Sequence, residues 1–182
     1  MLTVFDSAPG SGLLDGCVAV YRDAFGAPPY REPPEQAEEL RARIERYASR
    51  DGFVLPVFQH GDAGPVRGFA LAVVAHEGDW WRDAVAACVG PEITKRWLGD
   101  SVLEIVHVAV APGAQRSGIG RQMLDALVAG TSAPTAVLSV DPRAEEAQWF
   151  YLALGWTPIS TRLRTAPASA PTWLMGKDVV QI

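Results

Sequence analysis

The sequence predicts an α/β protein in which helices cover both faces of a mixed sheet. Two observations lead to this fold class. Segments rich in β-branched residues alternate along the chain with amphipathic segments whose apolar residues recur every three or four positions. The length of 182 residues, 48% of them hydrophobic, suits one domain with a sizeable core. We therefore expect a single domain over residues 1–182.

The N-terminal half predicts a strand, two helices and a β-hairpin, in that order. The loop between the two helices is rich in proline, which cannot continue a helix. Glu39 and Arg43 have the spacing of a pair along the second helix, and we expect them on its solvated face. The expected elements are a strand at 2–6, a helix that opens at 10–12 and ends near Gly26, a loop at 27–34, a helix covering 37–48, and strands at 53–60 and 66–75 around a turn at 61–64.

The C-terminal half predicts a helical segment followed by alternating strands and helices. Residues 76–100 are rich in Trp and interrupted by Gly90-Pro91, so we expect one or two short helices there. The later elements are expected as strands at 101–111, 135–140, 157–164 and 172–180, helices at 116–129 and 144–154, and an Ala/Pro/Ser connector at 165–171.

Charge and cysteine content exclude several classes of partner. The chain has 16 Lys and Arg against 21 Asp and Glu, a net charge of −5, and no basic run, so we expect neither nucleic acid nor a membrane surface as a partner. Cys17 and Cys88 are too few for a disulfide framework, and no Cys or His spacing suggests a metal site. No secretory signal or membrane span is recognisable, so we expect a cytoplasmic protein.

The stretch 104–124 places a predicted strand, a turn of small residues and a predicted helix in direct succession. Backbone N–H groups at the start of such a helix lack a partner within it, and with the helix dipole they favour a phosphate or pyrophosphate. Gly118 and Gly120 let a ligand approach the backbone, while Arg116 and Arg121 add positive charge. The chain has no GxxxxGK[ST] motif, and the turn lacks the third glycine of a dinucleotide fingerprint.

The pattern Gln115-x-x-Gly118-x-Gly120 after a strand resembles the cofactor signature of the GNAT superfamily of acyl-CoA-dependent N-acyltransferases. Residues 147–156, AQWFYLALGW, resemble a second helix of that family with the pattern Ala-x-x-Phe-Tyr-x-x-x-Gly-Phe. Together the matches cover about residues 101–157. The resemblance implies a GNAT-like mixed, mostly antiparallel sheet of about six or seven strands with helices on both faces. It also implies acetyl-CoA as co-substrate.

By the same resemblance, acetyl-CoA lies along the strand at 101–112 and the turn that follows it. The backbone of the strand faces the pantetheine, and the turn surrounds the pyrophosphate. The expected cofactor-binding residues are Val108, Ala109, Val110, Gln115, Arg116, Ser117, Gly118, Ile119, Gly120 and Arg121.

Two features depart from the family pattern. Ala144 stands where members often carry an Asn that bonds the cofactor or solvent. The Trp-rich segment at 76–100 is longer than a minimal member needs, and we treat it as a helical insertion that forms a substrate wall or a subunit contact. A homodimer through this segment or through the C-terminal strands is left open.

Aminolysis of a thioester needs a base for the amine's proton and an acid for the departing thiolate. Tyr151 lies where the family often uses a Tyr to protonate the CoA sulfur; the alternative is a core Tyr with a satisfied hydroxyl. Glu104 resembles the strand Glu that acts as the base in the histone acetyltransferase branch, and apolar neighbours would suit it to that role. Its alternative is a strand-end Glu in water or paired with Arg. His107 is a lesser base candidate, for which a structural or cleft-lining role is favoured.

Tyr30 and Trp80 are expected in the acceptor site, because the family builds this site from the loop between the first two helices and from neighbouring strands. Glu32 and Trp81 are further candidates, since aromatic walls with acidic groups suit a cationic amine. The alternative for the two tryptophans is that both anchor their helix to the core. The resemblance thus implies an N-acetyltransferase for a primary amine of a small molecule or peptide. The alternative is a non-catalytic acyl-CoA-binding sensor or regulatory module.

Overall fold

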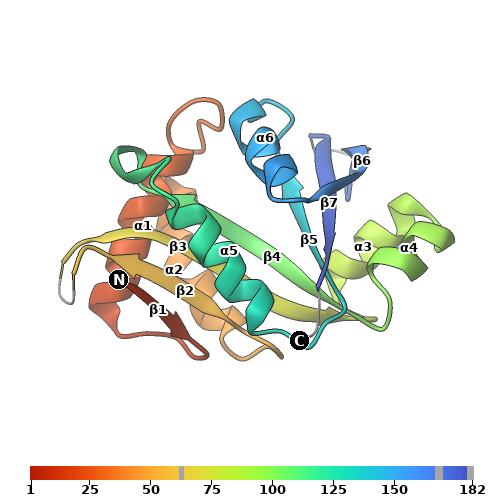
Figure 1. Ribbon diagram of the computed structural model, residues 1–182, viewed down its shortest axis with the longest axis horizontal. Coiled ribbons are helices and arrows are strands. Elements are labelled where there is room, and N and C mark those ends of the chain that lie inside the picture. Colours follow the sequence, from red (N-terminus) through yellow and green to blue (C-terminus); the bar gives the residue numbers. More distant parts are fainter. Residues whose placement is uncertain (62–63, 167–169, 180–182) are drawn as a thin grey trace. The chain divides into compact units, whose positions relative to one another are not determined.

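The computed structural model describes residues 1–61, 64–166 and 170–179. Its seven-stranded sheet has the order β1-β2-β3-β4-β5-β7-β6 (Figure 1). The pairs β1–β2, β2–β3, β5–β7 and β6–β7 are antiparallel, whereas β4 and β5 are parallel. The predicted mixed, mostly antiparallel α/β fold is therefore confirmed. The strands are β1 (Leu2–Phe5), β2 (Leu55–Gln59), β3 (Val66–His76), β4 (Ser101–Val110), β5 (Thr135–Val140), β6 (Thr157–Leu163) and β7 (Thr172–Asp178).

Helices connect these strands at the positions that the sequence pattern predicts. Within the described ranges, no helix combines the length and the apolar composition needed to cross a membrane. The helices are α1 (Ser11–Phe25), α2 (Pro34–Tyr47), α3 (Trp80–Val89), α4 (Pro91–Trp97), α5 (Ile119–Ala129) and α6 (Glu145–Ala153), with a 3-10 turn, η1, at Pro112–Ala114.

The chain divides into two compact units. The first unit consists of Met1–Val73 and Val106–Thr131, and the second consists of Val74–Ile105 and Ser132–Ile182. β3 and β4 each contribute residues to both units. Each unit is described by itself below.

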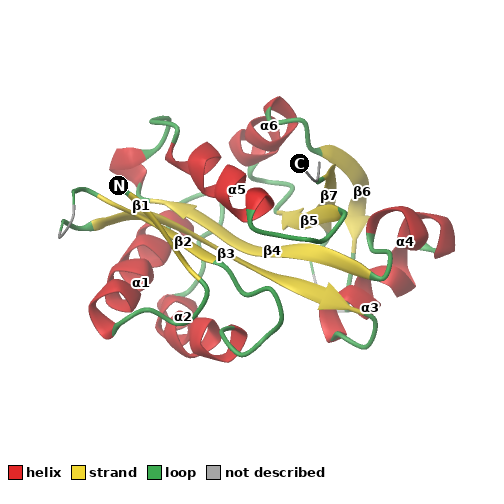
Figure 2. Ribbon diagram, turned by 60° about the horizontal axis from the view of Figure 1, so that its bottom comes forward, coloured by secondary structure: helices red, strands yellow, loops and turns green. Residues whose placement is uncertain are grey.

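In the first unit, α1 and α2 lie side by side on one face of the sheet, and α5 lies on the other face (Figure 2). The apolar sides of α1 and α2 enclose a core with β2 and β3 in which Leu40, Ile44, Leu55 and Phe69 are fully buried. Cys17 belongs to the same core, and burial raises the pKa of its thiol to about 12.

Local sequence signals set the ends of α1 and α2. The helix α1 ends at Phe25, and the N–H of Gly26 donates to the carbonyl of Arg22 at 2.9 Å. The helix α2 begins at Pro34, a position where the missing N–H of proline costs no hydrogen bond. The intervening prolines prevent one continuous helix, so a loop at 26–33 joins the two.

In the second unit, α3 and α4 pack against β5, β6 and β7. Val85 of α3 and Val137 of β5 are fully buried in a second core, and the rings of Trp81 and Trp97 pack against it. Cys88 of α3 is exposed. These contacts explain why the Trp-rich segment forms two helices rather than a loop.

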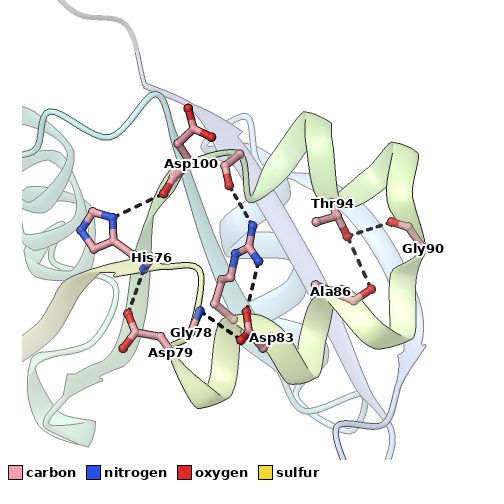
Figure 3. Close-up of polar contacts among 10 residues, drawn as sticks. His76, Gly78, Asp79, Asp83, Ala86, Gly90, Thr94 and Asp100 are labelled. Carbon is pink, nitrogen blue, oxygen red and sulfur yellow. Dashed lines mark hydrogen bonds and ion pairs between the residues drawn. The ribbon is translucent and has the colours of Figure 1, made fainter.

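Polar contacts fix the turn before α3 (Figure 3). The Asp79 carboxylate accepts a hydrogen bond from the N–H of His76 at 2.8 Å, and the Asp83 carboxylate accepts one from the N–H of Gly78 at 3.0 Å. These acidic residues therefore satisfy backbone donors. Across the residues with described positions, no group of His, Cys, Asp and Glu has the arrangement of a metal site.

Arg82 connects α3 to the turn before β4. It is 8% exposed, its Nη2 donates to the carbonyl of Gly99 at 2.9 Å, and its Nη1 pairs with Asp83 at 3.1 Å. A charge buried to this extent needs such partners. Polar contacts as well as apolar packing thus hold the segment at 76–100.

The predicted boundaries agree with the structure to within three residues, and the largest differences are at the starts of α2 and α5. The predicted loop at 27–34 is wrong at Pro34, which is the first residue of α2. The sequence predicts a helix from Arg116, but α5 begins at Ile119 because Arg116 and Gly118 have φ values of 58° and 83°, which interrupt a right-handed helix. The turn η1 was not predicted. Parts of the predicted hairpin turn, connector and last strand lie outside the described residues: 62–63, 167–169 and Val180.

The packing of α4 on β7 depends on Gly176. A Cβ atom at Gly176 would lie 2.5 Å from the Trp97 ring and 2.7 Å from Cδ1 of Ile159. We expect Gly176→Ala to lower the free energy of unfolding by about 1–3 kcal/mol, because the ring must move. Gly12→Ala in α1 is the control: nothing lies within 4 Å of its Cβ position. The control should stabilise the helix by up to about 1 kcal/mol. Urea denaturation measures both, and a Gly176→Ala protein as stable as wild type would contradict the packing.

Candidate active site

The turn after β4 is closed by its own hydrogen bonds. The N–H of Ala114 donates to the carbonyl of Ala111 at 2.7 Å, and the Ser117 hydroxyl donates to the carbonyl of Ala114 at 2.5 Å. The side-chain amide of Gln115 donates to the carbonyl of Val110 at 3.3 Å. Gln115 and Ser117 therefore hold the shape of the turn, a role that the sequence pattern alone did not assign.

The end of this turn presents backbone donors at the start of α5. Arg116 and Gly118 both have positive φ, and Gly118 is the left-handed residue from which the helix begins. The N–H groups of Ile119, Gly120 and Arg121 lie in the first turn, where no carbonyl within the helix can accept from them. That turn contains no acidic side chain, and the helix dipole adds partial positive charge. This end of α5 can therefore bind an anionic phosphate group.

Close packing at Gly68 of β3 sets the position of α5. A Cβ atom at Gly68 would lie 3.0 Å from the carbonyl oxygen of Ala109 and 3.0 Å from Cγ2 of Ile119. Ile119 is buried there, so its side chain packs in the unit while its backbone belongs to the turn. Arg121 is exposed, and its Nε lies 3.6 Å from the Asp125 carboxylate.

The strand β4 carries the residues expected along the pantetheine. Its ladder with β5 pairs Leu103, Glu104 and Ile105 with residues 136–138, and Val108–Val110 lie further along the strand. Ala109 is buried in the first core, whereas its two neighbours are partly exposed. The first half of the strand, 102–105, is buried, and most of its second half is partly exposed.

Glu104 is buried in the second unit, with 4% of its surface exposed. Its register partner on β5 is Val137, which belongs to the second core. The interpretation of Glu104 as a strand-end residue in water is therefore wrong. The catalytic role of Glu104 stays a prediction.

Tyr151 is 9% exposed on α6. Its ring centroid lies 5.2 Å from that of Phe150 and 5.8 Å from that of Trp156. This packing fixes the orientation of the Tyr151 ring. A fixed ring is expected for a proton donor and equally for a core residue. Ala144 begins α6 without a side-chain cap, and the amide of Gln148 instead donates to loop carbonyls at 2.9 and 3.2 Å. The loop before α6, in which Ala144 replaces the family's Asn, is thus held by hydrogen bonds from the Gln148 side chain of α6.

A cavity of about 220 Å³ lies between the end of α1 and the start of α2. Its wall includes Tyr21, Arg22 and Glu32. Tyr30, which the sequence assigned to the acceptor site, is not part of this wall; its ring packs against Phe25 at 4.9 Å between centroids. Glu32 places a carboxylate and Arg22 a guanidinium at the cavity, so its wall carries charges of both signs.

The adjacent tryptophans of α3 have different environments. Trp81 packs against the second core, but Trp80 is 73% exposed. The interpretation that both anchor the helix is therefore wrong for Trp80. An exposed indole is available to a ligand or partner, and the assignment of Trp80 to the acceptor site stays a prediction.

His107 and Arg43 make a contact that the sequence did not predict. Nη1 of Arg43 lies 3.2 Å from Nε2 of His107, and because a guanidinium can only donate, Nε2 accepts this hydrogen bond. Burial and the positive charge of Arg43 lower the pKa of His107 to about 3. A neutral imidazole whose lone pair is occupied is a poor base, so the geometry does not support a base role for His107. The predicted solvated position of Arg43 is wrong, since its side chain is 19% exposed.

The environment of His107 predicts acid sensitivity of the fold. The pKa of an unfolded His is about 6.5, and in the native protein it is about 3. Between these values only the unfolded state binds the proton, so stability falls as the pH drops, by at most about 1.4 kcal/mol per pH unit. We expect His107→Gln to remove this dependence while still accepting from Arg43. Urea unfolding at about pH 7, 5 and 4 measures the slope, and equal slopes for both proteins would contradict the assignment.

Comparison with known proteins places these features in a family. Residues 68–158, half of the 182 residues, match the family model described as an acetyltransferase (GNAT) domain. No curated protein sequence matches the chain significantly. Among solved structures, a GNAT-family protein from Desulfovibrio desulfuricans has a TM-score of 0.69 at 13% identity, with 99% of this chain and 100% of that chain covered.

Two further structures have similar folds. An aminoglycoside 6'-N-acetyltransferase complexed with coenzyme A has a TM-score of 0.63 at 16% identity, covering 100% of this chain and 98% of that chain. The ribosomal-protein-S18-alanine N-acetyltransferase from Escherichia coli has a TM-score of 0.60 at 15% identity, covering 100% and 96%. At these identities the likeness establishes the fold, and the family model establishes the family. The chain therefore belongs to the GNAT acetyltransferase family and is an acyltransferase.

Proposed function

We propose that the protein is an N-acetyltransferase that transfers the acetyl group of acetyl-CoA directly to a primary amine of a small molecule or peptide. The start of α5 carries this proposal, because its backbone donors and its lack of acidic residues suit the pyrophosphate of a CoA ester. The names of two similar structures support an amine acceptor, since one is an aminoglycoside and the other a protein alanine N-acetyltransferase.

The proposed cofactor site combines the end of β4 with the turn that follows it. The left-handed Gly118 aims the N–H groups of the first helical turn outward, and Arg116 and Arg121 supply positive charge. These features fit an anionic pyrophosphate, and the pantetheine is proposed to lie along the end of β4. The proposed contacts are Val108, Ala109, Val110, Gln115, Arg116, Ser117, Gly118, Ile119, Gly120 and Arg121.

Two side chains are proposed to move protons. When bound, acetyl-CoA supplies a thioester whose carbonyl carbon the amine attacks. As the C–N bond forms, Glu104 takes the amine's proton; as the C–S bond breaks, Tyr151 gives its hydroxyl proton to the sulfur and is reprotonated from solvent. No enzyme nucleophile is needed, and Cys17 is unsuited to be one because its pKa is raised to about 12.

The acceptor is proposed to bind beside the loop between α1 and α2. The Glu32 carboxylate, in a cavity wall that also contains Arg22, is proposed to pair with an ammonium group of the acceptor. Tyr30 lies in the same loop, and Trp80 is retained as an acceptor residue of the second unit. One domain over residues 1–182, a cytoplasmic location and a homodimer through 76–100 or the C-terminal strands stay predictions.

Binding of acetyl-CoA tests the cofactor site. We expect micromolar binding of acetyl-CoA in calorimetric titration, and at least about a tenfold weaker affinity for Gly120→Glu, because a carboxylate in the first turn of α5 repels the pyrophosphate. Ala129→Glu adds the same charge at the exposed, opposite end of α5 and is the control. Wild-type protein that binds neither acetyl-CoA nor longer acyl-CoAs would refute the proposal.

Catalytic roles are tested by two near-isosteric variants. With an amine panel and an assay for released CoA, Glu104→Gln should lower kcat about 100-fold or more and remove the acidic limb of the pH profile. Tyr151→Phe preserves the ring contacts with Phe150 and Trp156, and it should lower kcat while acetyl-CoA binding is kept. If both variants keep wild-type kcat at every pH, these residues are not the base and the acid.

A further inference from the structure

A connected set of polar side chains crosses the first unit from β4 to the loop between α1 and α2. We call it the Arg43 network and define it as His107, Arg43, Tyr21 and Glu32. Its members come from β4, α2, α1 and the loop, respectively. Tyr21 also belongs to the first core, whose other members are apolar. Tyr21 is buried and the other three are partly buried, and polar groups connected in this way need an explanation beyond packing.

Arg43 is the centre of the network. Its Nη1 lies 3.2 Å from Nε2 of His107, and its Nη2 donates to Oε1 of Gln36 at 3.1 Å. The Glu39 carboxylate lies 3.7 Å from Nη2, and the guanidinium lies close enough to Tyr21 to oppose the rise in its pKa. One planar guanidinium thus joins groups from α1, α2 and β4, a geometry that Lys cannot reproduce.

Tyr21 links Arg43 and His107 to the loop between α1 and α2. Its hydroxyl donates to Oε2 of Glu32 at 2.6 Å, and its ring meets the His107 ring edge-on at 5.3 Å between centroids. Burial and the hydrogen bond to Glu32 raise the pKa of Tyr21, so its hydroxyl remains a donor. The N–H of Glu32 also donates to the carbonyl of Phe25 at 2.9 Å. Both ends of Glu32 are therefore held, with its carboxylate at the cavity wall.

We propose that Arg43 is a positioning residue for the acceptor: through His107 and Tyr21 it fixes the Glu32 carboxylate, which recognises a cationic group of the acceptor. This proposal rests on the proposed function, because it concerns how the acceptor of that reaction is bound. A partly buried guanidinium costs desolvation energy that an apolar side chain would avoid. Here that cost is offset by hydrogen bonds that lead from β4 toward the cavity.

The charged groups that face His107 come from both helices packed against it. Arg43 and Glu39 lie on α2, Tyr21 lies on α1, and Glu32 lies beyond the Tyr21 hydroxyl. The adjacent guanidinium opposes protonation of the imidazole. The titration of His107 therefore reports whether the Arg43 contact is present.

The first experiment measures this titration by NMR of the histidine ring protons. The chain has only three histidines, His60 and His76 are exposed, and His107→Gln identifies the third set of signals. We expect His107 to stay neutral above about pH 5 in the wild type and in Arg43→Lys, which keeps the charge. In Arg43→Gln the pKa of His107 should rise measurably above that of the wild type but stay below the unperturbed value, because burial, the larger cause of the lowered pKa, remains. A wild-type His107 that titrates near its unperturbed value would overturn the network.

The second experiment measures acceptor kinetics with matched amines that differ in a second cationic group, such as cadaverine and aminopentanol. Arg43→Gln, Tyr21→Phe and Glu32→Gln should each raise KM for the dicationic amine about tenfold. KM for the amine with a neutral end, KM for acetyl-CoA and kcat should stay within about twofold. Arg41→Gln is the control. Arg41 lies on α2 like Arg43, but its guanidinium pairs with Asp15 of α1 outside the network, so we expect no change in KM or kcat.

The outcomes separate the two proposals. Wild-type protein that acetylates no amine in a panel including peptides and aminoglycosides refutes the proposed function. An active wild type whose three variants leave the KM of the dicationic amine unchanged, or raise the KM of both amines equally, refutes the positioning role. Thermal melting shows which variants are folded; if Arg43→Gln is not, Tyr21→Phe and Glu32→Gln decide the outcome, because they preserve the guanidinium and the shape of the core.

Discussion

The close approach of α5 to β3 is the constraint on which the proposed cofactor site of the first unit depends. It exists because position 68 is Gly: any side chain there would meet the carbonyl of Ala109 and the side chain of Ile119. Ile119 is also the first residue of α5, so a displacement of the helix would carry the donors of its first turn away from the end of β4. The packing of Ile119 against Gly68 therefore also sets the position of the backbone donors proposed to bind the anion, although Gly68 and Ile119 are far apart in the sequence.

Most of the fold could be predicted from the sequence because its elements are strongly periodic. The bounds of β5 agree with the expected 135–140, and the apolar stripe of α2 with Leu40 and Ile44 lies in the core as its spacing indicates. The start of α5 could not be predicted, because Arg116 adopts a left-handed conformation that non-glycine residues rarely adopt. The residues from Ile119 onward have a helical pattern, so the sequence contains no sign that the helix starts three residues after Arg116.

The candidate site was predictable where it depends on local backbone, and not where it depends on long side chains. The glycines of the turn and the strand before it are visible as a motif. The role of Arg43 is not, because its spacing from Glu39 also fits an exposed helical pair, whereas its guanidinium reaches His107, 64 positions away in the chain. The one local signal was His107 itself, since an imidazole on a covered strand requires a partner. No pattern within a single element could say which helix supplies it.

The two cysteines make the number of reactive thiols a measure of the integrity of the first core. Cys88 is exposed, whereas Cys17 is 0% exposed and has its pKa raised to about 12, so its thiolate is almost absent at neutral pH. A thiol reagent therefore modifies one sulfur in the folded chain and two in the unfolded chain. In any assay that detects free CoA by its thiol, Cys88 contributes a fixed background of one equivalent. A slower second equivalent reports the opening of the helices α1 and α2 from the sheet.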